Sequence, residues 1–553
     1  MKYQNYPVEC YDDLKQMLKQ VAEKYPNRTA FLQKEEGALR AYRYGRYNAD
    51  VNGLGTALTE MGLRDSRILL MGKNCYLWAV AYMAVINGVG VVMPVNSELS
   101  ERELLATADY AQADAVICAD EIFSKLVGLE KRIRVIPFSV LTSLIRRGRQ
   151  RIKSGDKGYL NAKIHPNAPC TMMFSSGTWG EMRGVMLSHR NLCFGVSEMR
   201  RMVQVGEGDV FLSVLPMHHI YECTCGFLCP LSCGASVAFS EGLERIGVNL
   251  REVSPTVMIC VPAILEGMYR RVWEQIRRHG AEARVKRIID VTNAIPNPKL
   301  QLSAKQKSFA PLHKVFGGKL RLLITGGATA SAEAVGGFRD LGILALQGYG
   351  MTECAPVIAL NRDTLYRDGA AGLPTPNALL DIVDMQEDGI GEIRYRGDGM
   401  MLGYYRMPKR TQAVIRDGWF YTGDLGYLDE DGFLYVLGRA ENVITLSDGR
   451  KILPEEIEGL LCRSPYIKEA VVVANGQENG EIPHLMALLC PDRERIAETY
   501  GVDENGEQTK LLMRRVLAEV NGTLPAYKRI ESFLLRPEGF PKTATGKIKR
   551  SAV

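Results

Sequence analysis

Residues suited to binding phosphate crowd into one short stretch of this chain, MMFSSGTWGEMRGVMLSH at positions 172–189. Glycines let a backbone turn tightly and approach an anion, while hydroxyl groups and a guanidinium supply donors and positive charge. The candidates in this stretch are Ser175, Ser176, Gly177, Thr178, Gly180, Arg183 and Gly184. Their spacing differs from the Walker pattern, because no Lys-Ser or Lys-Thr pair follows the last glycine. The stretch predicts a phosphate-binding loop that leads into a helix beginning at its Ser-His-Arg-Asn sequence, with an ordinary surface turn as the alternative.

Thirteen cysteines are scattered along the chain, an odd number that fits reduced thiols better than a disulfide framework. Cys225, Cys229 and Cys233 are spaced at i, i+4 and i+8, so they share one face of a helix if Pro230 permits one. They could present metal ligands, or they could pack as small apolar groups. Packing is the favoured interpretation, since the close Cys-x-x-Cys pairs of zinc sites are missing.

Composition sets the broad class of the protein. With 553 residues, 46% of them hydrophobic and 24% charged, the chain has room for more than one globular domain. The net charge of +6, from 69 basic and 63 acidic residues, is too small to indicate a nucleic-acid partner. Residues 1–26 show charges and a helical apolar rhythm rather than a signal peptide, which predicts a cytoplasmic location.

Two segments leave a membrane interpretation open. Residues 76–95 carry no charge, but two glycines and an asparagine interrupt them. A buried helix followed by a buried strand therefore explains them better than a membrane span. Residues 146–157, RRGRQRIKSGDK, are basic and poor in apolar anchors. They predict a solvated linker, although such a cluster could also touch an acidic membrane or a phosphorylated ligand.

The elements that position the phosphate loop follow from alternating helix and strand patterns. Between residues 11 and 138, helix-then-strand units repeat, which predicts a doubly wound parallel sheet. After the loop, strand patterns recur within residues 210–222, 254–262, 320–328 and 341–353. Ligands of open α/β sheets gather beyond the carboxyl ends of the strands. We therefore expect the loops after these strands to share one crevice with the phosphate loop.

The pattern changes near residue 381, where short strands with tight turns begin, including the Asp431-Gly432 hairpin signal. This change predicts a β-rich subdomain. Beyond Arg439, helix and strand patterns form an α+β module of about 115 residues, which is large enough to fold alone. The expected organisation is a large α/β N-terminal domain at 1–438, with doubly wound sheets and the β-rich subdomain, and a small α+β C-terminal domain at 439–553.

Separated motifs along the chain resemble, in the same order, those of the adenylate-forming superfamily, which includes acyl-CoA synthetases, peptide-synthetase adenylation domains and beetle luciferases. The motifs are FSSGTWGEMRGVMLSH, LPMHHIYE, ITGGA, QGYGMTE, YTGDLG, LGRAENVI and PKTATGKIKR. The resemblance covers nearly the whole chain, to Arg550. LPMHHIYE and HKVFGGKLRLLITGGA are most similar to the fatty-acyl-CoA synthetase branch.

The resemblance implies a role for each matched residue. In the N-terminal domain these roles are the gate of the acyl pocket for His219, contact with adenine for Gly326, Gly327 and Ala328, stacking on adenine for Tyr349, the α-phosphate for Thr352 and magnesium for Glu353. Further along they are the ribose hydroxyls for Asp424 and Arg439, the hinge for Glu441, the face used in thioester formation for Gly449 and the mobile catalytic lysine for Lys547. The residue types suit these tasks, because Mg²⁺ prefers hard carboxylate ligands and a lysine is a point charge on a flexible stem.

The phosphate loop departs from the family pattern at three positions. Trp179 stands where the family has a hydroxyl residue and adds bulk, and Met182 stands where the family has a proline and frees a backbone angle. Arg183 replaces a lysine, so it keeps the charge but offers a planar fork. These changes could slow ATP binding, yet Glu353 and Lys547 are both present.

The activity implied by the resemblance is that of an ATP-dependent carboxylate–CoA ligase of the fatty acyl-CoA synthetase type. Such an enzyme uses ATP, Mg²⁺ and coenzyme A and forms acyl-AMP with release of pyrophosphate. Three alternatives stay open: loading of a carrier-protein thiol, a nucleotide-binding relative without catalysis, and a protein that contacts membranes peripherally. The sequence gives neither the acyl chain length nor the oligomeric state.

Overall fold

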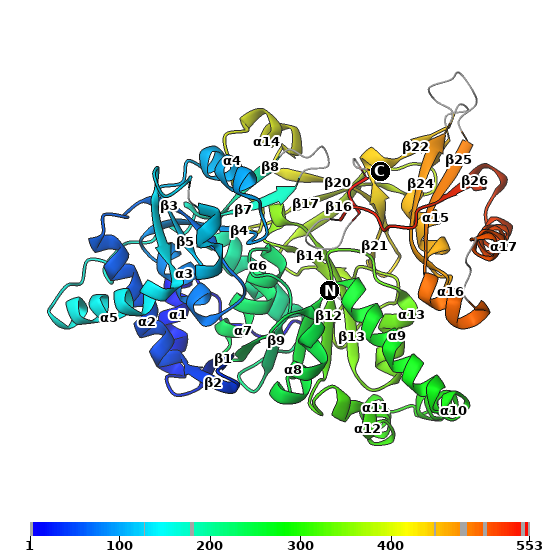
Figure 1. Cartoon of the computed structure of the whole chain (residues 1–553), viewed down its shortest axis with the longest axis horizontal. Helices are drawn as coiled ribbons and strands as arrows, with labels where there is room; N and C mark the ends of the chain where they lie inside the picture. The colour runs from blue at the N-terminus through cyan, green and yellow to red at the C-terminus, as the bar shows by residue number, and fades with distance from the viewer. Residues whose placement is uncertain are drawn as a thin grey trace. The chain divides into compact units, whose positions relative to one another are not determined.

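The computed structural model describes residues 4–126, 128–176, 182–446, 450–475, 484–501, 506–542, 548–550 and 553 (Figure 1). The chain forms two compact units. The first comprises residues 1–380, 395–420 and 432–434, and the second comprises residues 381–394, 421–431 and 435–553. The predicted α/β class, with a large N-terminal part and a smaller C-terminal part, is confirmed.

Nine of the described strands form the larger sheet of the first unit, in the order β15-β14-β13-β12-β11-β9-β10-β1-β2. Their bounds are β1 (Thr29–Glu35), β2 (Ala38–Arg43), β9 (Val210–Ser213), β10 (Ser236–Phe239), β11 (Val257–Cys260), β12 (Leu322–Thr325), β13 (Leu344–Gly350), β14 (Val357–Leu360) and β15 (Leu373–Pro374). The run from β1 to β13 is parallel, and β2, β14 and β15 join it antiparallel. The four strands expected after the phosphate loop are thus β9, β11, β12 and β13, and they lie side by side.

A second sheet in the first unit joins seven strands of the described ranges in the order β18-β8-β7-β4-β3-β5-β6. Their bounds are β3 (Ser66–Met71), β4 (Gly90–Val95), β5 (Ala115–Cys118), β6 (Arg134–Pro137), β7 (Pro169–Ser176), β8 (Met182–Ser188) and β18 (Gly403–Tyr404). The pairs from β7 to β6 are parallel, whereas β8 and β18 are antiparallel additions at one edge. The helix-then-strand repeat of residues 11–138 therefore builds a parallel sheet, as predicted.

Helices connect these strands in the first unit (Figure 1). Their bounds are α1 (Leu14–Lys24), α2 (Tyr44–Glu60), α3 (Tyr76–Ile86), α4 (Glu101–Ala111), α5 (Phe138–Lys153), α6 (His189–Met202), α7 (Cys229–Ser232), α8 (Ile246–Val253), α9 (Pro262–Arg278), α10 (Glu282–Asn293), α11 (Pro298–Ser308), α12 (Ala310–Val315), α13 (Ala332–Asp340) and α14 (Pro408–Val414). Helix α3 is buried around nearly its whole circumference and leads into β4, so residues 76–95 are the buried helix and strand that their pattern predicted. No helix in the described part of the chain is long and apolar enough to cross a membrane.

The prediction of a solvated linker at residues 146–157 is wrong over most of its length, because α5 continues to Lys153. Gly148 faces α2 so closely that a Cβ there would lie 1.8 Å from the carbonyl oxygen of Gly53. Arg151 forms an ion pair of 3.1 Å with Glu60 of α2. The basic residues stabilise a helix–helix contact between segments far apart in the sequence, and the local composition alone could not reveal these partners.

Short strands follow residue 378, as the pattern predicted. Within the described ranges they form a sheet in the order β16-β17-β20-β19, with β21 beside β20. The bounds are β16 (Leu379–Val383), β17 (Gly391–Arg396), β19 (Ile415–Arg416), β20 (Trp419–Leu428) and β21 (Leu434–Arg439). Gly432 adopts φ +85° in the turn between β20 and β21, a conformation that glycine tolerates at no steric cost.

The C-terminal part of the second unit is the expected α+β module. Its elements are β22 (Ile444–Thr445), β23 (Lys451–Ile452), α15 (Pro454–Leu461), β24 (Ile467–Asn475), β25 (His484–Pro491), α16 (Arg493–Tyr500), α17 (Glu507–Thr523) and β26 (Ile530–Leu535). Strand β25 pairs antiparallel with β24 and parallel with β26. Apolar residues of this sheet and of α15 and α17 form a common core that includes Ile457, Ala487 and Met513.

Candidate functional site

The predicted phosphate loop connects two antiparallel strands, β7 and β8, with Ser175 opposite Arg183 and Ser176 opposite Met182. The tip of this hairpin, which contains Gly177, Thr178, Trp179 and Gly180, lies outside the described residues. A Cβ at Gly184 would lie 2.6 Å from the sulfur of Met172, so the close pairing of the two strands requires glycine there. The hairpin thus presents its polar residues at the end of a packed β-ribbon.

Helix α6 begins directly after this hairpin, as the Ser-His-Arg-Asn sequence predicted. The Ser188 side chain accepts a hydrogen bond from the backbone N–H of Asn191, and the Asn191 side chain accepts one from the backbone N–H of Ser188. This reciprocal cap satisfies two donors at the start of the helix. It fixes the direction in which the chain leaves the hairpin.

Glu353 and Arg183 are brought together by Tyr404, a residue that the sequence did not single out. Strand β18 pairs with β8 so that Tyr404 lies opposite Val185. The Tyr404 hydroxyl donates a 2.9 Å hydrogen bond to Oε1 of Glu353, and the Arg183 guanidinium lies 5.9 Å from the centre of the Tyr404 ring. Burial and the neighbouring Glu353 carboxylate raise the pKa of Tyr404, so its hydroxyl keeps its proton and donates.

This arrangement suits a cation and an anion together. The Glu353 side chain is half-buried, and Tyr404 holds one of its oxygens, which is the kind of support that orients metal ligands. The Nε atom of Arg183 is buried with no hydrogen-bond partner among the described residues. Mg²⁺ takes few protein carboxylates and keeps several waters, and a guanidinium binds phosphate well. The residues present therefore fit a magnesium–phosphate group.

The ends of β12 and β13 bring the predicted adenine-contact residues side by side. Thr325 pairs in parallel with Gln347, so the Gly326-Gly327-Ala328 loop and Tyr349 leave the sheet at the same edge. The Tyr221 hydroxyl donates to the carbonyl oxygen of Ile324 at 3.1 Å, and a Cβ at Gly326 would lie 3.3 Å from the Tyr221 ring. Gly327 and Ala328 are exposed and Tyr349 is half-buried, so this edge offers space beside a ring.

Thr352 and Glu353 follow β13 in a single turn of 3₁₀ helix, Thr352–Cys354. The backbone N–H of Met401 donates a 2.8 Å hydrogen bond to the carbonyl oxygen of Glu353, which ties this turn to the segment before β18. A Cβ at Gly350 would lie 1.7 Å from the carbonyl oxygen of Pro356, so glycine is needed just before the turn. Thr352, Glu353 and Tyr349 therefore occupy one rigid strand end.

His219 lies in the loop after β9, beside His218, with ring centres 4.3 Å apart. Burial lowers the pKa of His219 to about 4, and burial together with His219 lowers that of His218 to about 3. The Nε2 atoms of both rings have no hydrogen-bond partner in the part of the chain that the structure describes. Both imidazoles are therefore neutral near pH 7, and they line an interior lacking polar partners.

Glu222 is a second residue that sequence reasoning missed. It starts a π-helix, Glu222–Leu228, the kind of helix that is frequent at functional sites. The Ser213 hydroxyl donates a 2.6 Å hydrogen bond to Oε1 of Glu222, and Asn74 Nδ2 donates to that hydroxyl at 2.9 Å. Burial raises the pKa of Glu222 to about 8, so the carboxyl group is largely protonated at neutral pH. A sequence signal existed, since Glu222 is the one Asp, Glu, Lys or Arg within residues 210–240.

The same Asn74 fixes the loop that carries the histidines. Its Nδ2 also donates to the carbonyl oxygen of Leu215 at 2.7 Å, and its Oδ1 accepts from the backbone N–H of Met217 at 2.8 Å. Both residues precede His218 directly in sequence. The network from Asn74 through Ser213 to Glu222 therefore holds the His218–His219 loop from both sides.

The cysteines of this region are packed rather than gathered around a metal. Cys223, Cys225, Cys229 and Cys233 are all buried and free. Among the described residues, no group of three or more His, Cys, Asp and Glu side chains could hold a metal ion. Pro230 lies in the first turn of α7, where a proline is tolerated. The segment continues from the π-helix into α7, which buries the thiols.

The predicted ribose-contact residues form a pair within the second unit. Nε of Arg439 lies 2.9 Å from Oδ1 of Asp424, and the Arg439 guanidinium donates at 3.0 Å to the carbonyl oxygen of Thr422. The Asp424 side chain is largely buried, and its backbone N–H donates to the Thr422 hydroxyl at 3.1 Å. Strands β20 and β21 thus place a carboxylate and a guanidinium side by side, which is a suitable pair for vicinal hydroxyl groups.

Lys547 and Gly449 lie outside the described residues. The segment that contains Lys547 is flanked by Lys542 and Ile548, which form an antiparallel bridge. Beyond it, the Arg550 guanidinium pairs with both carboxylate oxygens of Glu458 on α15. The chain on either side of Lys547 is therefore anchored to the body of the C-terminal module.

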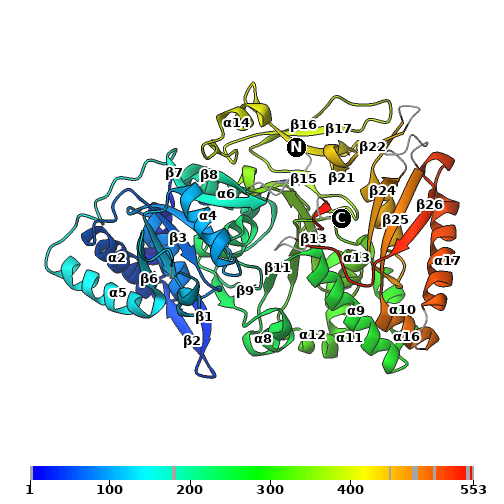
Figure 2. The same cartoon turned by 45° about the horizontal axis from the view of Figure 1, so that its top comes forward.

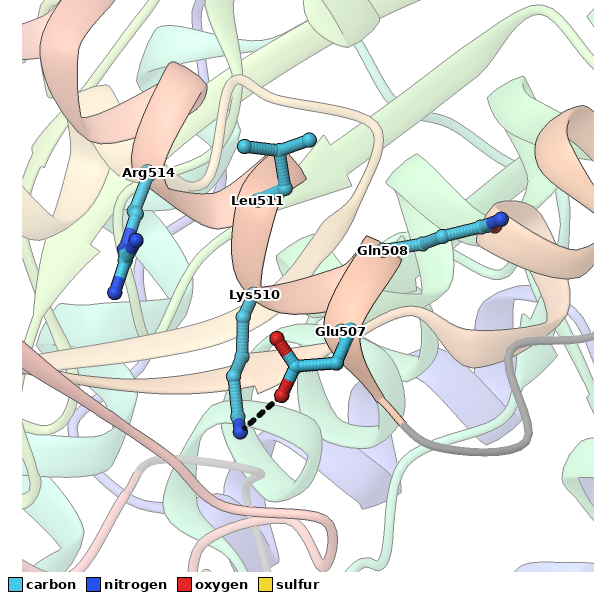
Figure 3. A pocket seen from close by; sticks show the side chains of 5 residues that line it. All are labelled: Glu507, Gln508, Lys510, Leu511 and Arg514. Atoms are coloured by element: carbon cyan, nitrogen blue, oxygen red, sulfur yellow. Dashed lines mark hydrogen bonds and ion pairs between the residues drawn. The ribbon is translucent and has the colours of Figure 1, made fainter.

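A shallow surface depression lies on α17 of the second unit (Figure 3). It is lined by Glu507, Gln508, Lys510, Leu511 and Arg514. The figure shows Glu507 and Lys510 joined by an ion pair of 2.8 Å, which is an ordinary contact between residues three apart on a helix. None of the predicted site residues belongs to this depression.

Two family models match the chain. An AMP-binding enzyme model matches residues 18–405, and a model of the AMP-binding enzyme C-terminal domain matches residues 441–553. The chain is 26% identical to fatty acyl-CoA synthetase B of Dictyostelium discoideum over 542 residues, which covers 90% of this chain and 79% of that protein. It is 25% identical to the chloroplastic long-chain-fatty-acid–[acyl-carrier-protein] ligase AEE15 of Arabidopsis thaliana, covering 90% of this chain and 78% of that protein.

Among solved structures, the anthranilate CoA ligase AuaEII in complex with anthranoyl-AMP has a similar fold. It superimposes with a TM-score of 0.77 at 18% sequence identity, covering 99% of this chain and 96% of that one. At this identity the likeness establishes the fold.

Proposed function

The chain belongs to the AMP-binding enzyme family, and from this premise we propose that it is an ATP-dependent carboxylate–CoA ligase that acts on a fatty acid through an acyl-AMP intermediate. The observation that carries the proposal is the Glu353 carboxylate, held by Tyr404 beside Arg183 at the phosphate hairpin. A carboxylate, a proton-bearing hydroxyl and a guanidinium in this order suit a magnesium-bound nucleotide. The proposed location is the cytoplasm.

The reaction brings two anions together, because a carboxylate oxygen of the acid attacks the α-phosphorus of ATP. That bond forms as the bond from the α-phosphorus to the bridging oxygen breaks, and pyrophosphate leaves. Mg²⁺, when bound, neutralises phosphate charge. Glu353 would hold the metal, Tyr404 would orient Glu353, and Arg183 and Ser175 would contact phosphate oxygens. Thr352, one residue before Glu353, is proposed to contact the α-phosphate.

Nucleoside selection is proposed to involve two groups of residues. Gly326, Gly327 and Ala328 would lie along adenine, with Tyr349 stacked on it, since these residues leave neighbouring strands at one edge of the sheet. Asp424 would accept hydrogen bonds from the ribose hydroxyls, with Arg439 fixing its carboxylate at 2.9 Å. A carboxylate that accepts two hydroxyl groups selects a ribose in dinucleotide-binding folds in the same way.

The C-terminal module at residues 439–553 is proposed to act as a mobile domain. Lys547 would stabilise the charge that develops during adenylation, and Glu441 would lie at the hinge. In the second step the face carrying Gly449 would admit the thiol, which attacks the carbonyl carbon and displaces AMP. Hinge motion of this kind lets one site perform two steps and excludes water from the reactive anhydride.

A fatty acid is the favoured acid. The relatives named as fatty acyl-CoA synthetases support it, and so does the apolar character of the interior beside His218 and His219, whose imidazoles are buried and uncharged. His219 is proposed to gate the acyl pocket. An acyl carrier protein is the alternative thiol donor, because one relative is named as a ligase for that acceptor.

Mass spectrometry of the reaction products tests the proposal. The protein is incubated with Mg-ATP, coenzyme A and carboxylic acids from acetate to long-chain fatty acids. An acyl-CoA product together with AMP is the expected result, and its mass identifies the acid. AMP or acyl-AMP without a thioester would favour the carrier-protein alternative, and nucleotide binding without AMP would contradict catalysis.

A further inference from the structure

A surface that none of the proposed steps uses lies on helices α9 to α12, residues 262–320. Figures 1 and 2 show α10, α11 and α12 grouped together, and they contact one another in sequence order. Three apolar side chains are exposed there: Val291 by 63%, Leu300 by 63% and Val315 by 51%. Exposed apolar side chains that gather on neighbouring helices indicate an interaction surface.

The same segment carries most of the positive charge excess of the chain. Residues 262–320 contain twelve Lys and Arg but four Asp and Glu, an excess of eight, whereas the excess over the whole chain is six. Two of the four acidic residues have partners within the protein. Glu282 pairs with Lys286 at 2.8 Å, and Glu266 accepts from the backbone N–H of Ser331 at 2.8 Å. The surface is therefore strongly basic.

Basic and apolar side chains alternate on the exposed sides of these helices. On α10, Arg284, Arg287 and Val291 are spaced at i, i+3 and i+7, which places them on one stripe. On α12, exposed Lys314 and Val315 are adjacent. Such a mixture is typical of helices that lie in the interface of a membrane, with apolar groups among the acyl chains and basic groups at the headgroups.

The other basic cluster of the chain, on α5, does not have this character. Arg147 and Arg151 both pair with Glu60 of α2, and Arg149 pairs with Asp50. These guanidiniums stabilise the packing of two helices. The structure thus moves the membrane alternative of the sequence from residues 146–157 to a different surface.

We propose that the α9–α12 surface, defined by Arg284, Arg287, Val291, Leu300, Lys314 and Val315, docks onto a bilayer that contains anionic lipid. Positive charge near such a bilayer is attracted by its surface potential, and exposed leucine and valine side chains gain by leaving water. Nucleic acid accounts less well for the surface, since it would leave three exposed apolar side chains without a role. The docking does not depend on the proposed catalytic function.

Vesicle co-sedimentation of the full-length protein tests the proposal. The vesicles contain phosphatidylcholine alone or phosphatidylcholine mixed with phosphatidylglycerol. We expect binding to the anionic vesicles that weakens as salt is added, and much weaker binding to phosphatidylcholine. Equal binding to both kinds of vesicle, or binding to neither, would overturn the proposal.

Two variants locate the surface, and a third serves as the matched control. In Arg284→Glu/Arg287→Glu/Lys314→Glu, we expect the partition coefficient to fall at least about tenfold, since each basic residue near the bilayer contributes about fivefold. In Leu300→Ser/Val315→Ser, the charge is unchanged and a fall of about tenfold is expected. The control, Arg146→Glu/Lys153→Glu/Lys157→Glu, makes the same change in charge on exposed residues elsewhere.

The control should change binding by less than about threefold, since long-range charge is screened by salt. An equal fall in the control and in the α9–α12 charge variant would show a general effect of net charge and overturn the proposal. Tighter binding to a DNA duplex than to the anionic vesicles would overturn it in favour of nucleic acid. Circular dichroism of each variant checks that the fold is kept, which is expected because all the replaced side chains are exposed.

Discussion

Replacing Tyr404 with phenylalanine should impair Mg²⁺-dependent adenylation while leaving the fold intact. The Tyr404 hydroxyl donates to Glu353 Oε1 at 2.9 Å, so the substitution removes one hydrogen bond to a carboxylate. The buried ring and the pairing of its backbone with Val185 are kept. Phenylalanine therefore separates the orientation of Glu353 from the packing around it.

The size of the effect follows from the strength of that bond. A hydrogen bond to a charged group contributes about 1.5–3 kcal/mol, which corresponds to about 10- to 150-fold in an equilibrium constant. Partners that orient metal ligands cost about 10- to 100-fold in metal affinity or activity when removed. Water can replace part of the lost bond because Glu353 is half-buried. We expect a loss of about tenfold or more, expressed as a higher Mg²⁺ concentration at half-maximal rate.

The assay is acid-dependent exchange of labelled pyrophosphate into ATP, measured over a series of Mg²⁺ concentrations. Tyr405→Phe is the matched control, because Tyr405 is the next residue and its hydroxyl contacts Gln112 at 2.9 Å and Arg67 at 3.0 Å instead of Glu353. The control should resemble the wild type. If Tyr404→Phe and Tyr405→Phe show the same Mg²⁺ dependence as the wild type, the role given to the Tyr404 hydroxyl is refuted.

Three further substitutions probe other parts of the account. The pKa of Glu222 is raised to about 8 in the folded state, so this group stabilises the fold fully below its ordinary pKa and loses that contribution as pH rises through 8. Glu222→Gln should therefore gain stability over the wild type between pH 5 and 8, by on the order of 4 kcal/mol at most, in urea unfolding; parallel pH profiles would contradict this. Asp424→Asn should raise the KM for ATP about tenfold or more with a smaller change in kcat, and an unchanged KM would exclude ribose contact. Lys547→Ala should slow adenylation about 10²- to 10³-fold but largely keep thioester formation from supplied acyl-AMP, whereas an equal fall in both steps would refute its role.

Much of the fold could be predicted because its signals are local. The alternation of helix and strand patterns in residues 11–138 gave the parallel sheet, and the apolar run at 76–95 gave α3 and β4. Strands β1 and β2 were missed, since exposed β2 shows little alternation and is fixed by pairing with β1. Helix α5 was missed because its arginines find their partners on α2.

The candidate site divides in the same way. The loops after β9, β11, β12 and β13 could be expected at one edge, because parallel pairing brings the carboxyl ends of strands together. Tyr404 could not be expected beside Glu353, since β18 joins β8 across more than 200 residues of sequence. The raised pKa of Glu222 likewise follows from burial, which a sequence position does not reveal.

The central claim, that the acid attacks the α-phosphorus of ATP, is tested most directly by tracing the carboxylate oxygen. The protein is given Mg-ATP, coenzyme A and a fatty acid whose carboxyl group carries oxygen-18. If acyl-AMP forms and the thiol then displaces AMP, one labelled oxygen must leave with AMP and none with pyrophosphate. Label in inorganic phosphate, or thioester formation with unlabelled AMP, would contradict the account.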